Sequence, residues 1–423
     1  MQALVLAAGK GTRMHSDLPK VLHPVLGVPI LGHVLQTLKE LGVTRPCVVI
    51  GSGADLVRSF LNTEKSTGFV PEAVLQKVQN GTGHAVMMAE RFLGRRQDEI
   101  LIWPGDMPLV RRETLETFIR YHREACAKAS VLSSLQPNPA GYGRILRAGG
   151  RFYAIREELD ATEIERRIQE VNTGIYLFNT AHLFRALRKI RPDNRKKELY
   201  LTDAIEILSG EEIPVAAFPL ALPDEGQGIN DRNDLANVMQ AMSEREIQKH
   251  MASGVTFVAP DQTFVAKDVK IGKDTVIYPW TYLEKNVRIG ERCEVGPFTK
   301  IRSGTVIGDD SVIGSFVEVT RSRLGKKVLA KHLTYLGDAT IGDDTNIGAG
   351  TITANFDGKH KYKTKIGKKN LIGSNTVLVA PVTLGDAVKT GAGAIVKART
   401  RAKKGTVLVG MPARPISKRK QRA

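Results

Sequence analysis

The stretch VKIGKDTVIYPWTYLEKNVRIG, residues 269–290, decides the fold of the second half of the chain, because an aliphatic side chain recurs in it at every sixth position. A six-residue period fits neither the turn of an α-helix nor the two-residue alternation of a simple strand. It is typical of a parallel β-helix, in which short strands alternate with corners and each coil stacks on the one before. The period runs unbroken through Val265, Ile271, Ile277, Leu283, Ile289, Val295, Ile301, Ile307, Ile313 and Val319.

The period is broken at two places. It slips within residues 321–336 and resumes at Ile341 and Ile347. The longer interruption is ANFDGKHKYKTK, residues 354–365, which is polar and basic. A segment that breaks the period has to leave the stack, so a protruding loop is expected there, and loops on rigid scaffolds often carry function. Beyond it the period continues with Ile366, Ile372, Leu378, Leu384, Thr390 and Val396.

The first half of the chain alternates predicted strands with predicted helices. Helical patterns cover Leu31–Leu41 and Arg112–Ala127, and a further helix with apolar residues on one side is expected around residues 230–253. This order predicts an α/β domain with a mostly parallel sheet, whose ligands lie at the carboxyl ends of the strands. The expected strands are Gln2–Ala7, Arg45–Gly51, Glu99–Trp103 and Ala129–Leu135.

Composition limits the kind of protein. A chain of 423 residues with 42% hydrophobic residues is long enough for two globular domains. No apolar run is long enough to span a membrane, no signal-peptide pattern opens the sequence, and three isolated cysteines indicate a reducing cytoplasm. The basic cluster SKRKQR, residues 417–422, is expected to be a disordered tail.

The net charge points to an acidic partner. A formal charge of +18 favours either nucleic acid or phosphorylated small molecules. Nucleic-acid motifs and the aromatic–basic interleaving of stacking platforms are missing from the sequence. Phosphorylated small molecules are therefore the favoured partners.

A second informative stretch is LVLAAGKGTRMHSDLPK, residues 4–20, an apolar strand that runs into glycines and basic residues. It matches neither the dinucleotide fingerprint, which needs a glycine where Met14 stands, nor the Walker A motif. Backbone N–H groups of such a loop can still cradle phosphate oxygens, and Arg13 and Lys20 add positive charge. Asp106, at the end of a predicted strand, is a natural Mg²⁺ ligand. Together these features predict phosphoryl or nucleotidyl transfer.

Several motifs follow in a fixed order and carry a family resemblance. After G-T-R-M and P-K come VLQKVQNGTGHAV (74–86), GDMPL (105–109), GYGRI (141–145), EVNTGIY (170–176), ELYLTD (198–203) and GIND (228–231). This set resembles the uridylyltransferase domain of the bifunctional N-acetylglucosamine-1-phosphate uridylyltransferase/glucosamine-1-phosphate acetyltransferase family. HLTYLGDA (332–339) and NIGAGTITANFDG (346–358) resemble the acetyltransferase domain of the same family.

The resemblance implies a domain plan. A Rossmann-like uridylyltransferase domain would cover residues 1–230 and a linker helix residues 231–253. A left-handed parallel β-helix with acetyltransferase activity would cover residues 254–410, and a basic tail residues 411–423. Such enzymes are cytoplasmic homotrimers that act on small molecules, without nucleic-acid or membrane partners. Their acetyl site lies between subunits, so the loop at 354–365 is expected to reach a neighbouring subunit.

The resemblance also implies the residues of uridylyl transfer. Arg13 and Lys20 would act on the phosphates of UTP, while Asp106 and Asn230 would hold Mg²⁺. Lys20 and Asn230 would also contact the nucleotide sugar. Gln76, Gly81 and Thr82 would contact the uracil and neighbouring groups, and Gly143, Glu157 and Asn172 would fix the N-acetylglucosamine. The other residues implied for binding UTP and the UDP-sugar are Leu6, Ala7, Ala8, Gly9 and Gly11. One departure is Pro104, where the family commonly has tyrosine before Gly-Asp.

For acetyl transfer, the resemblance implies that His332 is the general base and that Glu318 orients it. The residues implied for binding glucosamine-1-phosphate are Arg302, Tyr335, Asn346 and Lys361. Those implied for acetyl-CoA are Ala349, whose N–H would face the acetyl oxyanion, with Asn355, Phe356, Ser374 and Ala392.

The second domain departs from the family in three ways. Thr320 stands where the family has a phosphate-binding lysine, and the adjacent Arg321 would point to the opposite face of a strand. A basic residue is missing just before Met411. The β-helix is also about one coil shorter at its amino end, a change expected to spare a distant site.

Two alternatives remain open from the sequence alone. One is a monofunctional sugar-1-phosphate nucleotidyltransferase whose β-helix only assembles or regulates. His332 within its full motif speaks against that alternative, while Thr320 favours it. The other is a basic scaffold or nucleic-acid binder without catalysis. Four residues speak against it, namely Arg13, Lys20, Asp106 and Asn230.

Overall fold

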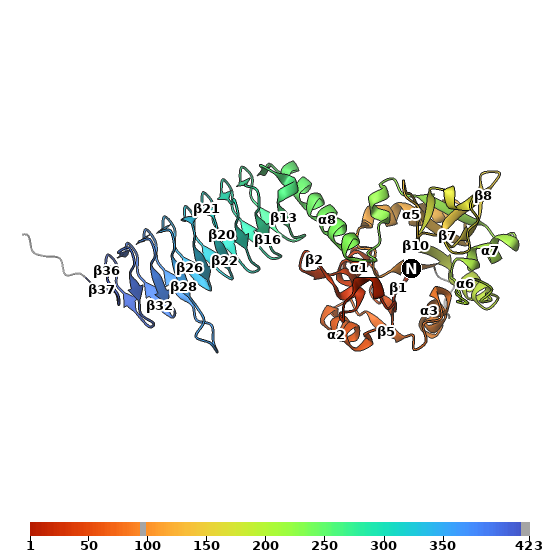
Figure 1. The fold of residues 1–423 in the computed structure, drawn as a ribbon, viewed down its shortest axis with the longest axis horizontal. Coiled ribbons are helices and arrows are strands. Elements are labelled where there is room, and N and C mark those ends of the chain that lie inside the picture. The colour runs from red at the N-terminus through yellow and green to blue at the C-terminus, as the bar shows by residue number, and fades with distance from the viewer. Residues whose placement is uncertain (94–98, 416–423) are drawn as a thin grey trace, which may run out of the picture. The chain divides into compact units, whose positions relative to one another are not determined.

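The computed structural model describes residues 1–93 and 99–415, which form two compact units (Figure 1). The division falls between Val238 and Met239, within the long helix α8 (Arg232–Ala252). The predicted tail cluster at 417–422 lies outside the described residues. Among the described residues, no helix is long and apolar enough to cross a membrane.

The first unit is built on one mixed β-sheet. Its strands are β1 (Gln2–Ala7), β4 (Cys47–Ile50), β5 (Glu72–Leu75), β6 (Glu99–Pro104), β7 (Ala129–Leu135), β8 (Arg144–Ala148), β9 (Arg151–Arg156), β10 (Glu170–Asn179) and β11 (Val215–Pro219). Strands β6, β1, β4 and β5 lie side by side and run parallel, as predicted. Strand β10 runs antiparallel to β6 and β7, and it also pairs antiparallel with β8, which forms an antiparallel hairpin with β9. A small separate hairpin joins β2 (Pro24–Val25) and β3 (Val28–Pro29).

Helices cover both faces of this sheet (Figure 1). They are α1 (Ile30–Glu40), α2 (Ala54–Glu64), α3 (Thr82–Met88), α4 (Glu90–Leu93), α5 (Arg112–Glu124), α6 (Thr180–Leu187) and α7 (Asp203–Gly210). Successive side chains of β1 alternate between two hydrophobic cores. Leu4 packs with residues of α3, α6 and α7, whereas Ala3 and Val5 pack with residues of α1, α2 and α5. The predicted α/β fold is confirmed, with α1 and α5 at the places where helical patterns were seen.

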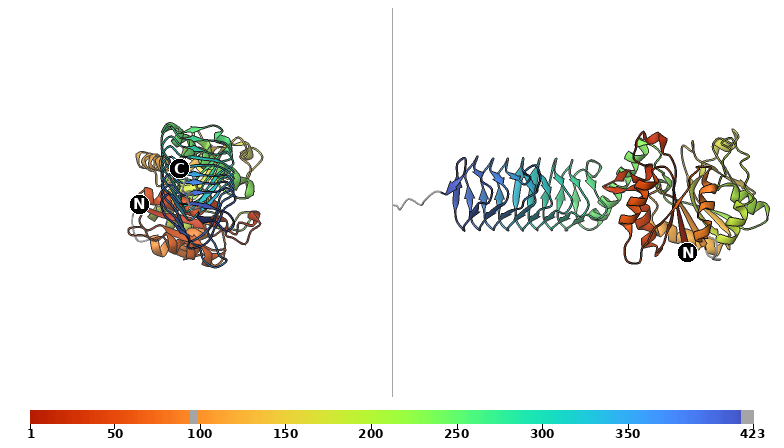
Figure 2. Two further views of the ribbon diagram at one scale, coloured as in Figure 1. Left: turned by 90° about the vertical axis from the view of Figure 1, so that its left-hand side faces the viewer. Right: turned by 90° about the horizontal axis from the view of Figure 1, so that it is seen from below.

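The second unit is a parallel β-helix made of three sheets, which Figure 2 shows from a further side. Ile277, Val295 and Ile313 lie opposite one another in successive coils and are fully buried, as the six-residue period requires. The first sheet contains β12 (Thr256–Phe257), β15 (Val276–Ile277), β18 (Glu294–Val295), β21 (Val312–Ser315), β24 (Leu329–His332), β27 (Asn346–Ile347), β30 (Leu371–Ile372), β33 (Lys389–Thr390), β36 (Val407–Val409) and the antiparallel β37 (Arg414–Pro415).

The other two sheets complete each coil. The second sheet contains β13 (Phe264–Val265), β16 (Tyr282–Leu283), β19 (Lys300–Ile301), β22 (Glu318–Thr320), β25 (Tyr335–Gly337), β28 (Ile352–Ala354), β31 (Val377–Val379) and β34 (Ile395–Val396). The third sheet contains β14 (Lys270–Ile271), β17 (Arg288–Ile289), β20 (Val306–Ile307), β23 (Arg323–Leu324), β26 (Ala339–Ile341), β29 (Thr364–Ile366), β32 (Val382–Leu384) and β35 (Arg401–Ala402).

Both predicted breaks of the period are confirmed in the coils. Val295 lies opposite Ile313, eighteen residues further on, but Ile313 lies opposite Ala330, only seventeen residues further on. This shorter coil is the slip seen in the sequence. Strand β28 ends at Ala354 and β29 begins at Thr364, and the segment between them leaves the stack as a loop (Figure 1).

Helix α8 corrects one expectation. The sequence predicts Ile247 and Met251 on the apolar side of this helix. Ile247 is buried, but Met251 is 39% exposed, whereas the polar Ser243 and Glu246 are buried. The Ser243 hydroxyl accepts a hydrogen bond from the backbone N–H of Val265 at 3.0 Å. A polar residue can occupy the packed side of the helix because its hydrogen bond to the backbone is made there. The packed side of the helix therefore includes Leu235, Val238 and Ile247 as expected, but it also contains polar residues and leaves Met251 out.

An apolar ridge follows the corner between the first and second sheets. Trp280, Phe298, Phe316 and Leu333 take the same corner position in four successive coils and are 49–62% exposed. All four have φ between 50° and 59°, a conformation that bulky residues rarely adopt. The rings of Phe298 and Phe316 stack with 5.1 Å between their centroids. These four residues are called the aromatic ridge below.

Candidate active sites

The glycine-rich loop follows the carboxyl end of β1. Gly11 has φ 61°, and a Cβ added there would lie 2.7 Å from the Cβ of Lys20, so this position requires glycine. The loop contains two short 3-10 helices. The first, η1 (Thr12–Met14), carries Arg13, and the second, η2 (Lys20–Leu22), begins with Lys20. Two basic side chains are thereby placed beside the glycines of the loop.

Four predicted residues meet at this loop. The backbone N–H of Ile229 donates to the carbonyl of Asp106 at 2.9 Å, which brings the 228–231 motif beside the end of β6. The Lys20 ammonium forms an ion pair with the Asp106 carboxylate. Arg13 Nη2 donates to Asn230 Oδ1 at 2.9 Å. Residues that are far apart in the sequence therefore form one group, in which two cationic side chains contact the side-chain oxygens of Asp106 and Asn230.

The chemistry of this group suits a divalent cation bound together with phosphates. Among the described residues, no three His, Cys, Asp or Glu side chains cluster as a metal site. Mg²⁺ typically uses only one or two protein oxygens in addition to substrate phosphates. The side-chain oxygens of Asp106 and Asn230 each accept from a cationic group in this structure. The side-chain oxygens of both residues therefore already face a positively charged group.

The predicted nucleobase residues lie at the start of α3. The buried Gln76 side chain donates to the carbonyl of Gly81 at 3.2 Å. Thr82 Oγ1 accepts from the backbone N–H of Leu201 at 3.0 Å, which ties α3 to the ELYLTD segment. A Cβ added at Gly81 would lie 2.5 Å from the carbonyl oxygen of Leu199, so only glycine permits this approach.

The predicted sugar residues are held by β10 and its neighbours. The backbone N–H of Asn172 donates to the carbonyl of Gly143 at 2.8 Å. The Glu157 carboxylate accepts from the Thr202 hydroxyl at 3.2 Å, and burial raises the pKa of this carboxyl. Burial, with the neighbouring Glu206 and Glu157 charges, also raises the pKa of Asp203 to about 6. Asp203 ends the ELYLTD motif but was not singled out from the sequence.

Pro104 packs within the first unit and leaves the turn before Asp106, the candidate metal ligand, intact. It ends β6, and its Cγ would lie 2.9 Å from a Cβ added at Gly174, so the proline ring packs against the glycine of the EVNTGIY motif. The backbone N–H of Gly105 still donates to the carbonyl of Leu6 at 2.8 Å, which holds the turn that leads to Asp106.

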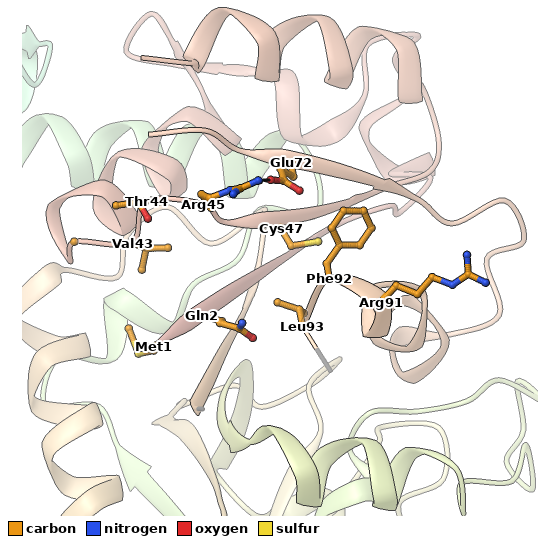
Figure 3. A pocket seen from close by; sticks show the side chains of 11 residues that line it. Met1, Gln2, Val43, Thr44, Arg45, Cys47, Glu72, Arg91, Phe92 and Leu93 are labelled. Atoms are coloured by element: carbon orange, nitrogen blue, oxygen red, sulfur yellow. Dashed lines mark hydrogen bonds and ion pairs between the residues drawn. The ribbon is translucent and has the colours of Figure 1, made fainter. Parts of the chain in front are cut away.

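The cavity drawn in Figure 3 lies at the opposite edge of the same sheet. It measures about 440 Å³, and its lining includes Gln2, Cys47 and Glu72 at the amino ends of β1, β4 and β5. The candidate residues lie beyond the carboxyl ends of these strands, which is the ligand-binding edge of α/β sheets. Burial, aided by the Glu72 charge, raises the pKa of the Cys47 thiol to about 12, so the thiol stays protonated. We assign no catalytic role to this cavity.

In the β-helix, one set of predicted residues follows the corner between the first and second sheets. His332 is exposed at the end of β24, beside the last residue of the aromatic ridge. Further along the same corner, Asn375 donates its backbone N–H to the carbonyl of Ala349, and Gly393 donates to that of Ser374. The predicted acetyl-CoA residues Ala349, Ser374 and Ala392 therefore lie in line on successive coils, and Asn346 lies nearby in β27.

A second set lies at the corner between the second and third sheets. The amide nitrogen of Asn355 donates to the Asp338 carboxylate. A Cβ added at Gly337 would meet the Tyr335 hydroxyl at 2.6 Å and the Asn355 amide at 2.7 Å, so these two side chains converge. Phe356 pairs with Lys361 across the base of the protruding loop. The predicted acceptor and acetyl-CoA residues are thus divided between two corners of one chain.

Arg321 corrects the expectation drawn from strand alternation. Strand β22 ends at Thr320, and Arg321 lies at a corner with φ 48°, so the alternation of a strand does not apply to it. Its Nη1 donates to Thr320 Oγ1 at 3.2 Å, and its Nε and Nη2 bind the Asp338 carboxylate at 2.7 and 2.8 Å. The guanidinium therefore lies with the second set of residues and holds the pKa of Asp338 below its ordinary value.

Glu318 has a partner other than the one expected. Its Oε1 accepts from Arg302 Nη1 at 3.0 Å. In the register of the first two sheets, His332 lies opposite Ser315, whereas Glu318 lies opposite Tyr335. Within the described part of a single chain, Glu318 therefore makes no hydrogen bond to His332.

Family models match both units. Residues 3–201 match the MobA-like NTP transferase domain. Residues 268–303 and 286–321 match the bacterial transferase hexapeptide, and residues 363–398 match the hexapeptide repeat of succinyl-transferase. With the glycine-rich loop described above, these matches define a nucleotidyltransferase that carries a hexapeptide-repeat transferase domain.

Relatives that match almost the whole chain show which family of transferases it belongs to. The chain is 41% identical to the bifunctional protein GlmU of Geobacillus thermodenitrificans, covering 93% of this chain and 92% of that one. It is 42% identical to the bifunctional protein GlmU of Syntrophomonas wolfei, covering 94% of each chain. The chain belongs to the GlmU family of bifunctional proteins. The predicted family and the bifunctional enzyme are confirmed, and the monofunctional alternative is less well supported.

Proposed function

We propose that this chain makes UDP-N-acetylglucosamine in two steps, acetylation of glucosamine-1-phosphate followed by uridylyl transfer from UTP. The observation that carries the proposal is the meeting of Arg13, Lys20, Asp106 and Asn230 at one loop. Nucleotidyl transfer requires positioning and charge neutralisation more than a protein nucleophile, and this group supplies both. The unpaired cysteines agree with both reactions taking place in the cytoplasm.

In uridylyl transfer, Arg13 and Lys20 would release Asn230 and Asp106 and bind the triphosphate instead. An oxygen of the sugar phosphate then attacks the α-phosphorus in line, a new P–O bond forms, and pyrophosphate leaves. Asp106 and Asn230 would hold Mg²⁺, which when bound neutralises charge on the phosphates. Gln76 and Thr82 would face the uracil, while Glu157 and Asn172 would orient the sugar.

In acetyl transfer, the His332 imidazole would remove a proton from the amine of glucosamine-1-phosphate. The amine nitrogen attacks the thioester carbonyl, a C–N bond forms and the C–S bond breaks. The departing CoA thiolate takes up the proton held by the imidazole and leaves as free CoA. The Ala349 N–H would stabilise the oxyanion, since a backbone donor in a preformed corner needs no reorganisation. Arg302 and Lys361 would bind the phosphate of the acceptor.

We further propose that the acetyl site forms between copies of the chain in a homotrimer. His332 and the Ala349–Ser374–Ala392 line follow one corner, whereas Tyr335, Asn355 and Lys361 lie at the other corner of the second sheet. Two neighbouring subunits could bring these corners together. The aromatic ridge borders His332 and exposes large apolar side chains, which favours its burial against a second copy.

Replacing Phe298 by glutamate is expected to convert the trimer to monomers, because a carboxylate would be buried in the ridge contact. Acetyl transfer should be lost with the trimer, while uridylyl transfer is kept. Light scattering after gel filtration measures the assembly. Thr383→Glu, on the exposed face of the third sheet, is the matched control and should remain trimeric. A trimeric, fully active Phe298→Glu protein would exclude the ridge as the interface.

The proposed function is tested by free thiol release from acetyl-CoA and glucosamine-1-phosphate. Thiol release that depends on the amine establishes acetyl transfer and makes Thr320 a tolerated change. Pyrophosphate release from UTP and N-acetylglucosamine-1-phosphate tests the other reaction on the same sample. Pyrophosphate without thiol release would mean that the β-helix serves only for assembly.

A further inference from the structure

The residue that opens helix α8 contacts both short helices of the phosphate loop. Arg232 Nε donates to the backbone carbonyl of Met14, the last residue of η1, at 3.1 Å. Its Nη1 lies 3.3 Å from Nδ1 of His23, the residue that follows η2. A guanidinium always donates, so the imidazole accepts at this nitrogen. One side chain therefore bridges the ends of the two turns that carry Arg13 and Lys20.

The two residues that accept hydrogen bonds from Arg232 are buried. His23 and Met14 are both buried, with 4% and 1% of their surface exposed. Burial, with the Arg232 charge, lowers the pKa of His23, which favours the neutral ring that can accept from a guanidinium. On the other side of the loop, Gly11 and Lys20 touch closely enough to exclude a Cβ. The two turns are thus fixed against each other from both sides.

Most other contacts of the loop hold it to neighbouring segments or lie within one turn, such as the ion pair of Lys20 with Asp106 and the bond from Arg13 to Asn230. Within η1 the backbone N–H of Met14 donates to Gly11, and that of His15 donates to Thr12. His15 has φ 46°, a conformation that is uncommon for a residue other than glycine. These bonds shape each turn but do not set the distance between the turns. The bridge from Arg232 does so, because its planar donors have a fixed separation.

We propose that Arg232 is a positioning residue that sets the spacing of Arg13 and Lys20 for the nucleotide phosphates. The inference rests on the proposed uridylyl transfer and deepens it. Arg232 is not assigned to contact substrate; it acts through the carbonyl of Met14 and the ring of His23. Its place at the first turn of α8 also ties the phosphate loop to that helix.

The test compares Arg232→Met with Arg232→Lys. The methionine removes all donors, whereas the lysine keeps the charge but lacks the fork that reaches two acceptors at a fixed separation. Both variants are expected to raise KM for UTP by about tenfold or more and to lower kcat for pyrophosphate release, since charged hydrogen bonds position the loop. KM for N-acetylglucosamine-1-phosphate should change little, and thiol release in the acetyl reaction should be unchanged.

Two controls separate positioning from general stability. Arg120→Met removes an exposed arginine from α5 in the same unit and should leave both reactions unchanged. Equilibrium binding of UTP to each variant, measured by calorimetry well below its melting temperature, should weaken only at position 232. Unchanged UTP binding and kinetics in a folded Arg232→Met or Arg232→Lys protein would overturn the inference. If the unsubstituted chain releases no pyrophosphate, the proposed function fails instead.

Discussion

Asp106→Ala is expected to reduce uridylyl transfer by about 10²- to 10³-fold, because loss of a group that stabilises transition-state charge has effects of this size. The substitution removes the carboxylate that pairs with Lys20 at the phosphate loop. Acetyl transfer by the same protein should be unchanged, because its residues lie in the second unit. The measurement is pyrophosphate release from UTP beside thiol release from acetyl-CoA.

The matched control for Asp106→Ala is Asp193→Ala, which removes an exposed carboxylate from the same unit. Its uridylyl transfer should equal that of the unsubstituted chain. Loss of both reactions in a folded Asp106→Ala protein would contradict the independence of the two sites. Undiminished pyrophosphate release would remove Asp106 from the proposed mechanism.

His332→Ala is expected to have the reverse effect. General-base catalysis typically contributes about 10²- to 10⁴-fold, so thiol release should fall by that amount while pyrophosphate release continues. The side chain is exposed at the end of β24, so its removal should not disturb the buried core of the coil.

Lys331→Ala is the matched control for His332→Ala, since it truncates the adjacent exposed residue of the same strand. Its thiol release should be close to that of the unsubstituted chain. The assembly of both variants has to be compared by light scattering, because His332 borders the aromatic ridge. A trimeric His332→Ala protein with full acetyl transfer would show that another group takes the proton.

Much of the fold follows from hydrophobic periodicity. Strands β1 and β7 were predicted with their observed bounds because each is a short segment rich in aliphatic residues. The inward positions of the β-helix were predicted because six-residue spacing leaves little choice of register. The antiparallel direction of β10 was not predicted, since strand direction depends on long-range pairing that a local pattern does not encode.

The candidate site was only partly readable from the sequence. The motifs identified Asp106 and Asn230, and the structure places their segments side by side. The role inferred for Arg232 could not be seen, because it donates to a backbone carbonyl and no motif records such a partner. The corner conformation of Phe298 was equally hidden, since bulky residues rarely take positive φ.

If the loop binds the nucleotide as proposed, the ion pair of Lys20 with Asp106 affects which form of the nucleotide it accepts. A bare triphosphate that draws Lys20 away leaves the carboxylate facing the phosphates, and like charges at a few ångströms repel strongly in a partly buried site. A nucleotide that arrives with its own compensating positive charge satisfies both groups at once. In that case the loop would discriminate between charge states of one ligand, before any contact with its base or sugar is made.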